Sequence, residues 1–413
     1  MTPKLFLSNF MEGTKTILPV SPYREALESI LDYWIARTID PVKGGFYGRI
    51  RADDTVEMDA PRGSVLNARI LWTFSAAYRL NRREDCLDTA TRCYRYIVEH
   101  FIDHNRGGVY WSIDADGRPL DTKKQIYALA FTVYGLTEYF AATGLPEARE
   151  AAIRLYRDIE EHSYDKVRGG YLEAFSADWT ALADLRLSAK DANEKKTMNT
   201  HLHVLEAYTN LYRIWKDPGL QQQVYRLIAN FLQHMIDPIT HHLVLFLDED
   251  WNPRSDTISY GHDIEASWLL LEAAEIVSDH EETVVRPVRK ISLDMVKAAA
   301  EGLAPDGALY YEYEPAGDHW RKEKHWWVQA EAMVGFVNAW QLSGDPAFYY
   351  QFEGVWSFID RFIIDHARGE WIWGLQEDNT PMAGEDKVGI WKCPYHNGRA
   401  LIELIRRLPA KKE

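Results

Sequence analysis

The sequence predicts an all-α protein, an (α/α)6 barrel of about twelve helices with short β-ribbons in the connecting loops. A glycine- and aromatic-rich motif recurs six times, at spacings of 63, 62, 72, 65 and 63 residues. Roughly two helical patterns lie between successive copies, one amphipathic and one more apolar. A helix with a polar face meets solvent, whereas a helix that is apolar nearly all round is buried. Six such pairs fit a closed double ring better than an open solenoid, which would show polar capping repeats.

Each copy of the motif is expected to form a short β-ribbon after a turn. The three clearest copies are GGFYGRI at Gly44, GGVYWSI at Gly107 and GGYLEAF at Gly169. Degenerate copies follow as HHLVLFL at His241, DGALYYEY at Asp306 and GEWIWGL at Gly369.

The two sets of helices alternate along the chain. The amphipathic set, expected on the outside, comprises Tyr23–Ala36, Cys86–Phe101, Glu147–His162, Leu220–Met235, Thr283–Ala300 and Ala347–Ile364. The apolar set, expected on the inside, comprises Ser64–Leu80, Lys124–Ala141, Thr197–Ile214, His262–Val277, Trp327–Leu342 and Pro394–Leu408. No linker rich in Pro, Gly or Ser divides the chain, so we expect a single domain over residues 1–413.

Composition narrows the class of protein. The 413 residues are 46% hydrophobic, and the net charge of −15 argues against nucleic acid and anionic membranes as partners. No apolar run is long enough to span a bilayer, and residues 1–10 lack the apolar core of a secretory leader. Three cysteines are too few for a disulfide framework. A cytoplasmic protein, monomeric or weakly dimeric, is expected.

In such a barrel the inner helices point one end at a central cavity, and polar residues near their N-termini are candidates for function. One polar group on a buried helix is usually a satisfied core residue. Several in register around one ring are not explained so easily. The candidates are Arg69, Tyr127, Asn199, His203, His262, Glu265, Glu331 and His396.

Two of these candidates are histidines in the first turn of different inner helices. His262 and Glu265 lie on one helix face, and the positive charge of a helix start favours a neutral imidazole, although Asp263 and Glu265 oppose it. His396 follows Pro394, which suits the first helical position. The pair is therefore expected to flank one bound molecule; helix capping or core hydrogen bonding is the alternative.

The motifs that would indicate other chemistry are missing from the sequence. His201 and His203 point apart on a helix and make a poor chelate, and no HExxH, EF-hand or CxxC pattern is present. Dinucleotide, P-loop and GxSxG motifs are absent too, and nothing marks Cys393 as a nucleophile. We therefore expect no metal and no cofactor, but proton transfer on a reducing sugar. Ring opening makes the C2 hydrogen acidic, a base removes it, and Arg69 would stabilise the enediolate.

Long stretches of the chain resemble a known family, the cellobiose 2-epimerase branch of the N-acylglucosamine 2-epimerase superfamily. The stretches are SVLNARILWTFSAAYR, GGVYWSIDADGRPLDTKKQIYALAF, NTHLHVLEAYTNLYR, GHDIEASWLLLEAAE, KHWWVQAEAMVGF and KVGIWKCPYHNGRALIEL. The resemblance implies reversible epimerisation at C2 of the reducing glucose of β-1,4-linked disaccharides. Cellobiose would give glucosyl-mannose and lactose would give epilactose, with no metal or nucleotide required.

The resemblance also implies roles for individual residues. His262 and His396 would be the paired general base and acid, His203 the ring-opening residue and Arg69 the enediolate stabiliser. Groups that hold the reducing sugar would be Tyr127, Asn199, Glu265 and Trp391. Stacking platforms for the second sugar would be Trp373 and one of Trp326 and Trp327. Glu331, which follows the tandem tryptophans on the same helix, is a further candidate for the substrate site.

Three other functions are left open by the residues. A mannose isomerase or N-acylglucosamine 2-epimerase would use the same histidines on a monosaccharide. A glycoside hydrolase of this fold would need two carboxylates across the scissile bond, recruited from Asp263, Glu265 and Glu331. In a non-catalytic sugar-binding protein the histidine pair would be surplus.

Overall fold

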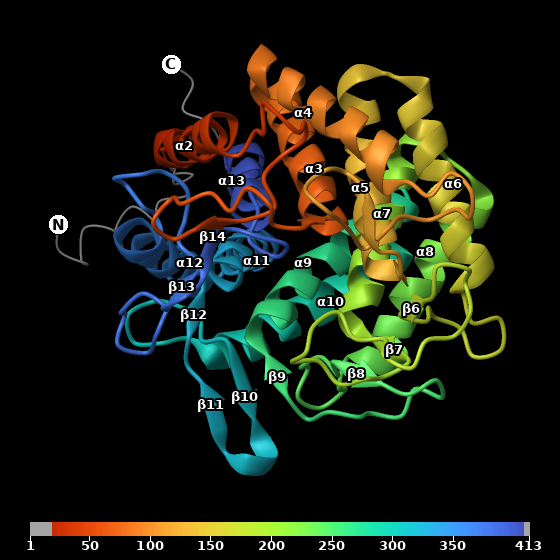
Figure 1. Cartoon of the computed structure of the whole chain (residues 1–413). Coiled ribbons are helices and arrows are strands. Elements are labelled where there is room, and N and C mark those ends of the chain that lie inside the picture. The colour runs from red at the N-terminus through yellow and green to blue at the C-terminus, as the bar shows by residue number, and fades with distance from the viewer. Residues whose placement is uncertain (1–18, 409–413) are drawn as a thin grey trace.

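The computed structural model describes residues 19–408 (Figure 1). Residues 1–18 and the tail at 409–413, which the sequence predicts to fray, lie outside this range. Twelve α-helices occupy the described residues, joined by strands of two or three residues each. Among them, no helix combines the length and the apolar character needed to cross a bilayer.

Six helices form the inner ring and are buried on nearly every face, as their apolar sequences predict. Most begin directly after a short strand, and most start and end within about two residues of the predicted bounds. They are α3 (Ser64–Asn81), α5 (Ile126–Thr143), α7 (Met198–Ile214), α9 (Tyr260–Val277), α11 (Trp326–Ser343) and α13 (Tyr395–Arg407).

The other six helices lie outside and bury one face each. They are α2 (Ser21–Arg37), α4 (Glu84–Tyr96), α6 (Pro146–His162), α8 (Pro218–Asn230), α10 (Glu282–Ala299) and α12 (Pro346–Phe358). Three were predicted to run on as regular helix but end in a π-helical turn: η1 (Ile97–Phe101), η2 (Phe231–Met235) and η5 (Ile359–Ile363). The wider turn buries both its first and its last side chain, as Ile97 and Phe101 show.

Short antiparallel ribbons link each repeat to its neighbour. The pairs are β2 (Arg62–Gly63) with β3 (Ser112–Ile113), β5 (Lys124–Gln125) with β6 (Ala174–Phe175), β7 (Lys196–Thr197) with β8 (Phe246–Leu247), β9 (Ile258–Ser259) with β10 (Glu312–Glu314), β12 (Lys324–His325) with β13 (Gly374–Leu375), and β1 (Ile50–Arg51) with β14 (Asp386–Val388). Two sheets gain a third strand, β4 (Pro119–Asp121) beside β3 and β11 (His319–Arg321) beside β10, and 3-10 turns occur at η3 (Ala300–Gly302) and η4 (Pro315–Gly317).

The ribbon between β1 and β14 joins the first repeat to the last. Ile50 pairs with Val388, and α13 packs against both α2 and α3. These contacts close the ring, which confirms the predicted barrel and excludes an open solenoid. Figure 1 shows the first and last helices, α2 and α13, side by side.

The glycine pairs of the motif turn the chain between an outer helix and its ribbon. Gly170 has φ +76°, and a Cβ built on it would lie 2.5 Å from the ring of Trp251. A side chain there would be strained and would clash, so the position requires glycine.

A buried ion pair ties most of these turns to the start of an inner helix. An aspartate at the turn meets a cation on the strand or bridge that precedes the helix, and the cations are at most 2% exposed. The pairs are Arg62–Asp40 at 2.6 Å, Lys124–Asp103 at 2.7 Å, Lys196–Asp165 at 3.1 Å, Lys324–Asp306 at 2.6 Å and Lys387–Asp365 at 2.8 Å. The ends of the inner helices that carry the candidate residues are therefore fixed to the loop layer.

Candidate active site

Residues from all six inner helices meet at the N-terminal end of the barrel. His203 lies edge-on to Tyr127, with ring centroids 5.0 Å apart, and Trp391 lies 6.0 Å from Tyr127. On the other side Trp327 contacts both His262 and His396, with centroid distances of 4.8 and 5.7 Å. The structure thus brings together the three histidines that the sequence places on α7, α9 and α13.

The tandem tryptophans at the start of α11 face different surroundings. Trp327 is half-buried and touches both histidines, whereas Trp326 is only 2% exposed. Trp326 packs on Trp373, 4.7 Å away, and under the Lys392 ammonium group. Of the two, Trp327 is therefore placed to contact a ligand between the histidines, and Trp326 belongs to the core.

Two further tryptophans, Trp373 and Trp391, are half-buried like Trp327, and we call these three side chains with Trp111 the aromatic wall. Trp373 lies beside Trp326, and Trp391 lies 5.9 Å from Trp111. Trp111 comes from the second copy of the repeat motif, and no sequence signal separates it from ordinary ribbon residues.

Each of the three histidines is anchored through Nδ1. The Nδ1 of His203 lies 2.9 Å from Glu206, that of His396 lies 2.7 Å from Glu331, and that of His262 lies 2.8 Å from the Ser259 hydroxyl. An ionised carboxylate only accepts, so His203 and His396 carry their proton on Nδ1. None of the described residues hydrogen-bonds the three Nε2 atoms, which are left to meet a substrate.

A buried hub that sequence analysis missed holds the carboxylates in place. Arg399 donates from one guanidinium nitrogen to Glu206. A second nitrogen donates to Glu265 and to Glu331, and both of these bonds are 2.7 Å long. The Tyr395 hydroxyl also donates to Glu206. One sequence signal could have found the hub: Arg399 and Glu206 each follow a candidate histidine by three residues and so share its helix face.

The structure gives the surroundings of three acidic residues near this hub. Glu331 is fully buried behind His396 and also accepts from the Trp268 indole at 3.2 Å. Glu265 lies 3.9 Å from His396 Nδ1 and is bound by Arg399, so both support the histidine from behind. Asp263, expected to oppose a neutral His262, points away and accepts from His242 Nδ1 at 2.7 Å.

Burial and the neighbouring charges shift the pKa values of these groups. Burial, helped by nearby His203, lowers the pKa of His262 to about 3. The pKa of His396 is also held well below its ordinary value, by burial and then by Arg69 and Arg399. Burial, with Glu331 nearby, raises the pKa of Glu265 to about 7. Burial would raise the pKa of Glu206 as well, but Arg399 and His203 bring it down to about 2. Both histidines of the pair are therefore neutral, the form that a base requires.

Arg69 is 2% exposed and forms no ion pair with the described carboxylates. Its guanidinium donates to the Tyr127 hydroxyl at 2.7 Å and lies 3.9 Å from Cys393 Sγ. It also lies over the rings of Phe131 and Tyr395, at 4.2 and 5.0 Å from their centroids. Because arginine stays charged, the site holds an uncompensated positive charge.

The remaining candidate, Asn199, lies half-buried in the first turn of α7. Its side-chain oxygen is buried and has no hydrogen-bond partner among the described residues. A bound hydroxyl group is the kind of donor that would satisfy it.

One group of described residues has the donor atoms to hold a metal ion. Ligand atoms of Glu265, Glu331 and His396 lie within 4.8 Å of one another. Arg399 already binds both carboxylates, so the group has a positive partner in a guanidinium. The absence of a metal stays a prediction.

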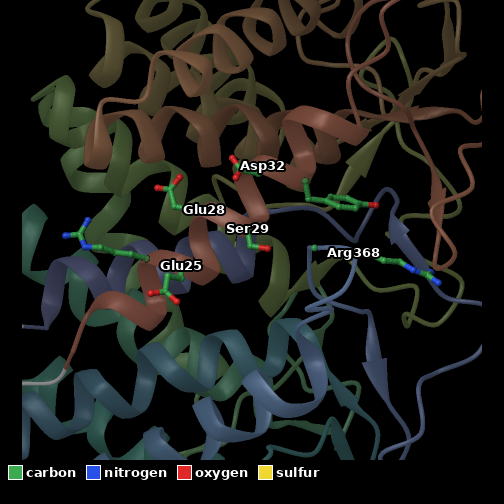
Figure 2. Close-up of a pocket in the computed structure, with 8 residues that line it drawn as sticks. Glu25, Glu28, Ser29, Asp32 and Arg368 are labelled. Atoms are coloured by element: carbon green, nitrogen blue, oxygen red, sulfur yellow. The ribbon is translucent and has the colours of Figure 1, made fainter.

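A groove of about 600 Å³ lies elsewhere, on the outer face of α2. Figure 2 shows Glu25, Glu28 and Asp32 of α2 along it, with Arg368 at one end. The groove contains no histidine and no aromatic pair, and it is separate from the inner helix ends.

Known proteins resemble this chain in both fold and sequence. The chain matches the N-acylglucosamine 2-epimerase family over residues 45–400. It is 49% identical to a cellobiose 2-epimerase of Bacteroides fragilis, over 94% of this chain and 99% of that protein. The solved cellobiose 2-epimerase of Bacillus thermoamylovorans aligns with a TM-score of 0.89 at 39% identity, covering 94% of this chain and 99% of that one. A D-mannose isomerase of Marinomonas mediterranea is 25% identical, over 92% and 96%.

The chain therefore belongs to the N-acylglucosamine 2-epimerase family. It is a carbohydrate epimerase built on an (α/α)6 barrel, as its sequence predicts.

Proposed function

We propose that this protein reversibly epimerises C2 of the reducing-end glucose of β-1,4-linked disaccharides, converting cellobiose to glucosyl-mannose and lactose to epilactose. The observation that carries the proposal is that His262 and His396 are both anchored through Nδ1 and both lie against Trp327. Two such bases allow a proton to leave one face of C2 and return on the other. The similarity to cellobiose 2-epimerases supports the disaccharide as substrate.

The reaction begins with ring opening. His203, held by Glu206, moves the proton between the C1 hydroxyl and the ring oxygen, which frees the aldehyde. Rotation about the C2–C3 bond then presents either face of C2 to the histidine pair. One of His262 and His396 removes the C2 proton, and the electron pair moves onto the carbonyl oxygen to give a cis-enediolate.

Arg69 stabilises the negative charge of that intermediate. Its guanidinium is already buried and fixed by Tyr127, so no reorganisation is needed when the charge appears. The partner histidine on the opposite face takes up a proton from solvent and delivers it to C2, while the first histidine releases its proton to solvent. Delivery on the opposite face inverts C2, and ring closure through His203 completes the conversion with no net change of protons.

The aromatic wall supports a disaccharide over a monosaccharide. Trp327, Trp373 and Trp391 are three half-buried indoles near the histidines, and aromatic side chains commonly line ligand sites. We assign Trp327 and Trp391 to the reducing sugar and Trp373 to the second sugar. Asn199 would accept a hydrogen bond from a hydroxyl group of the reducing sugar, and Tyr127 would donate one to it.

Hydrolysis is disfavoured by the state of the carboxylates. A hydrolase needs two carboxyl groups free on either side of the scissile bond. Here Glu265 and Glu331 are bound by Arg399, and Asp263 by His242. We further propose that the enzyme works in the cytoplasm, as a monomer or weak homodimer, without metal or organic cofactor.

The test is NMR of the purified protein with cellobiose in deuterated water. We expect deuterium at C2 and a mannose-type reducing end, and loss of both in His262→Ala and His396→Ala. Free glucose would instead show hydrolysis. No reaction with cellobiose, followed by turnover of free mannose or N-acetylglucosamine, would move the substrate to a monosaccharide.

A further inference from the structure

Arg69 differs from every other buried cation of the described chain. Seven other lysine and arginine side chains are buried to the same degree, and each has a carboxylate oxygen within 3.1 Å. They are Arg62, Lys124, Lys196, Lys324, Lys387, Lys392 and Arg399. Arg69 has a phenol, a thiol and aromatic faces instead.

These neighbours do not neutralise the guanidinium. Aromatic faces attract a cation, but they remove only part of the cost of taking it out of water. Its Nε atom is buried and has no hydrogen-bond partner among the described residues. The protein therefore maintains an unpaired positive charge beside the place where C1 and C2 of a sugar would lie.

The acidic residues across the site do not serve as counterions for Arg69. Glu206, Glu265 and Glu331 are turned to Arg399 and to the Nδ1 atoms of His203 and His396. The site is thus divided into a side where every charge is paired and a side where Arg69 is not. An anionic ligand would meet Arg69 first.

A neutral sugar does not balance the positive charge of Arg69, and the enediolate balances it only for the short lifetime of the intermediate. A stable ligand that would balance that charge is an open-chain sugar whose C1 is a carboxylate. That group is planar at C1, as the enediolate is, and its negative charge lies on the same oxygen. It has no aldehyde to acidify the C2 hydrogen, so the histidines cannot turn it over.

We propose that the active site also binds aldonic acids, the C1-oxidised open-chain forms of its disaccharide substrates, which inhibit the enzyme competitively through Arg69. This inference rests on the proposed function, since it assumes that the sugar lies with C1 beside Arg69. It implies regulation: a reaction that oxidises the reducing end of the same disaccharide would supply the inhibitor.

Two open-chain ligands of equal length separate charge from shape. Cellobionate carries the C1 carboxylate, and cellobiitol carries a neutral alcohol there. Titration calorimetry of the full chain should give wild-type protein a preference for cellobionate of roughly 10- to 150-fold, the range for one hydrogen bond to a charged group. Added cellobionate should raise KM for cellobiose and leave kcat unchanged.

Variants at Arg69 then locate the effect. Arg69→Met, of similar length but uncharged, should bind the two ligands equally, with cellobiitol affinity near the wild-type value. Arg69→Lys keeps the charge and should retain part of the preference, provided that thermal melting shows both variants folded. Arg118→Met, at a side chain 77% exposed, is the matched control and should behave as wild type.

Equal wild-type affinities for the two ligands would overturn the inference. A preference that persists in Arg69→Met would overturn the assignment to Arg69. Deuterium exchange with cellobiose is measured on the same samples. Active enzyme without a preference refutes this inference alone, whereas preference without C2 exchange refutes the proposed reaction alone.

Discussion

Glu331→Gln tests how far the catalytic pair depends on its buried support. The Glu331 carboxylate accepts from His396 Nδ1 and from Arg399, both at 2.7 Å, and from the Trp268 indole at 3.2 Å. Glutamine has the same shape but only one acceptor oxygen. His396 and Arg399 both donate to Oε1, and Trp268 donates to Oε2. The glutamine amide group must therefore face either the Trp268 indole or both His396 and Arg399, and in each orientation the negative charge is lost.

The size of the effect follows from these contacts. A hydrogen bond to a charged group contributes about 1.5–3 kcal/mol. Its loss in the transition state corresponds to a fall in kcat of roughly 10- to 150-fold. The fall would be larger, up to about 10⁴-fold, if the amide forces His396 to carry its proton on Nε2, as the comparable substitution does in a serine protease.

The assay is the initial rate of cellobiose epimerisation, with ¹⁵N NMR of His396 to report which nitrogen carries the proton. Glu138→Gln is the matched control. Glu138 is also a buried glutamate with an arginine partner on an inner helix, but it lies on the C-terminal half of α5. We expect near-normal kcat from the control. A wild-type kcat in folded Glu331→Gln would refute the view that Glu331 sets the state of His396.

Three further predictions concern the aromatic wall, pH and the loop layer. Trp327→Ala should lose activity but keep its melting temperature. Trp326→Ala should lose about 3–5 kcal/mol of stability, because it removes a large buried side chain. The reverse pattern in a thermal melt and a rate assay would contradict the assigned positions. Burial raises the pKa of Glu173 to about 8, above its unfolded value of about 4.3. This group's contribution to stability is therefore full below about pH 4.3 and is lost as pH rises towards 8, by up to about 1.4 kcal/mol per unit. Glu173→Gln should flatten that slope in urea unfolding across this window, and an unchanged slope would show that Glu173 is not the cause. Lys124→Met leaves Asp103 buried without its ionic partner and should lower the free energy of unfolding by about 3–5 kcal/mol in the same assay. The double variant Asp103→Leu with Lys124→Met should recover most of that loss. A small loss in Lys124→Met alone would mean that water reaches the pair.

Much of the fold was predictable because the signals are local and repeated. The spacing of the motif gave the number of repeats, and the apolar sequence of helices such as α9 separated inner from outer positions. The π-helical turn at Ile97–Phe101 was not predictable, because two apolar residues four positions apart share a face in an ordinary α-helix as well. That the whole chain forms one domain stays a prediction.

The candidate site was predictable in its residue types and less so in its geometry. His203, His262, His396 and Arg69 were found because polar groups stand out at the starts of apolar helices. Arg399 was not recognised, because an arginine near the chain's end reads as a surface residue until its partners are known.

The sequence by itself determined the repeat, the alternation of helices and the set of polar groups at one end of the inner ring, since all of these follow from periodicity within a helix. Only the tertiary structure decided how those groups pair. Whether Trp326 or Trp327 faces the histidines, whether Glu331 meets a sugar or a histidine, and whether Arg69 has a counterion depend on contacts between helices far apart in the chain. Those contacts are set by the closure of the ring, and no pattern within one helix encodes them.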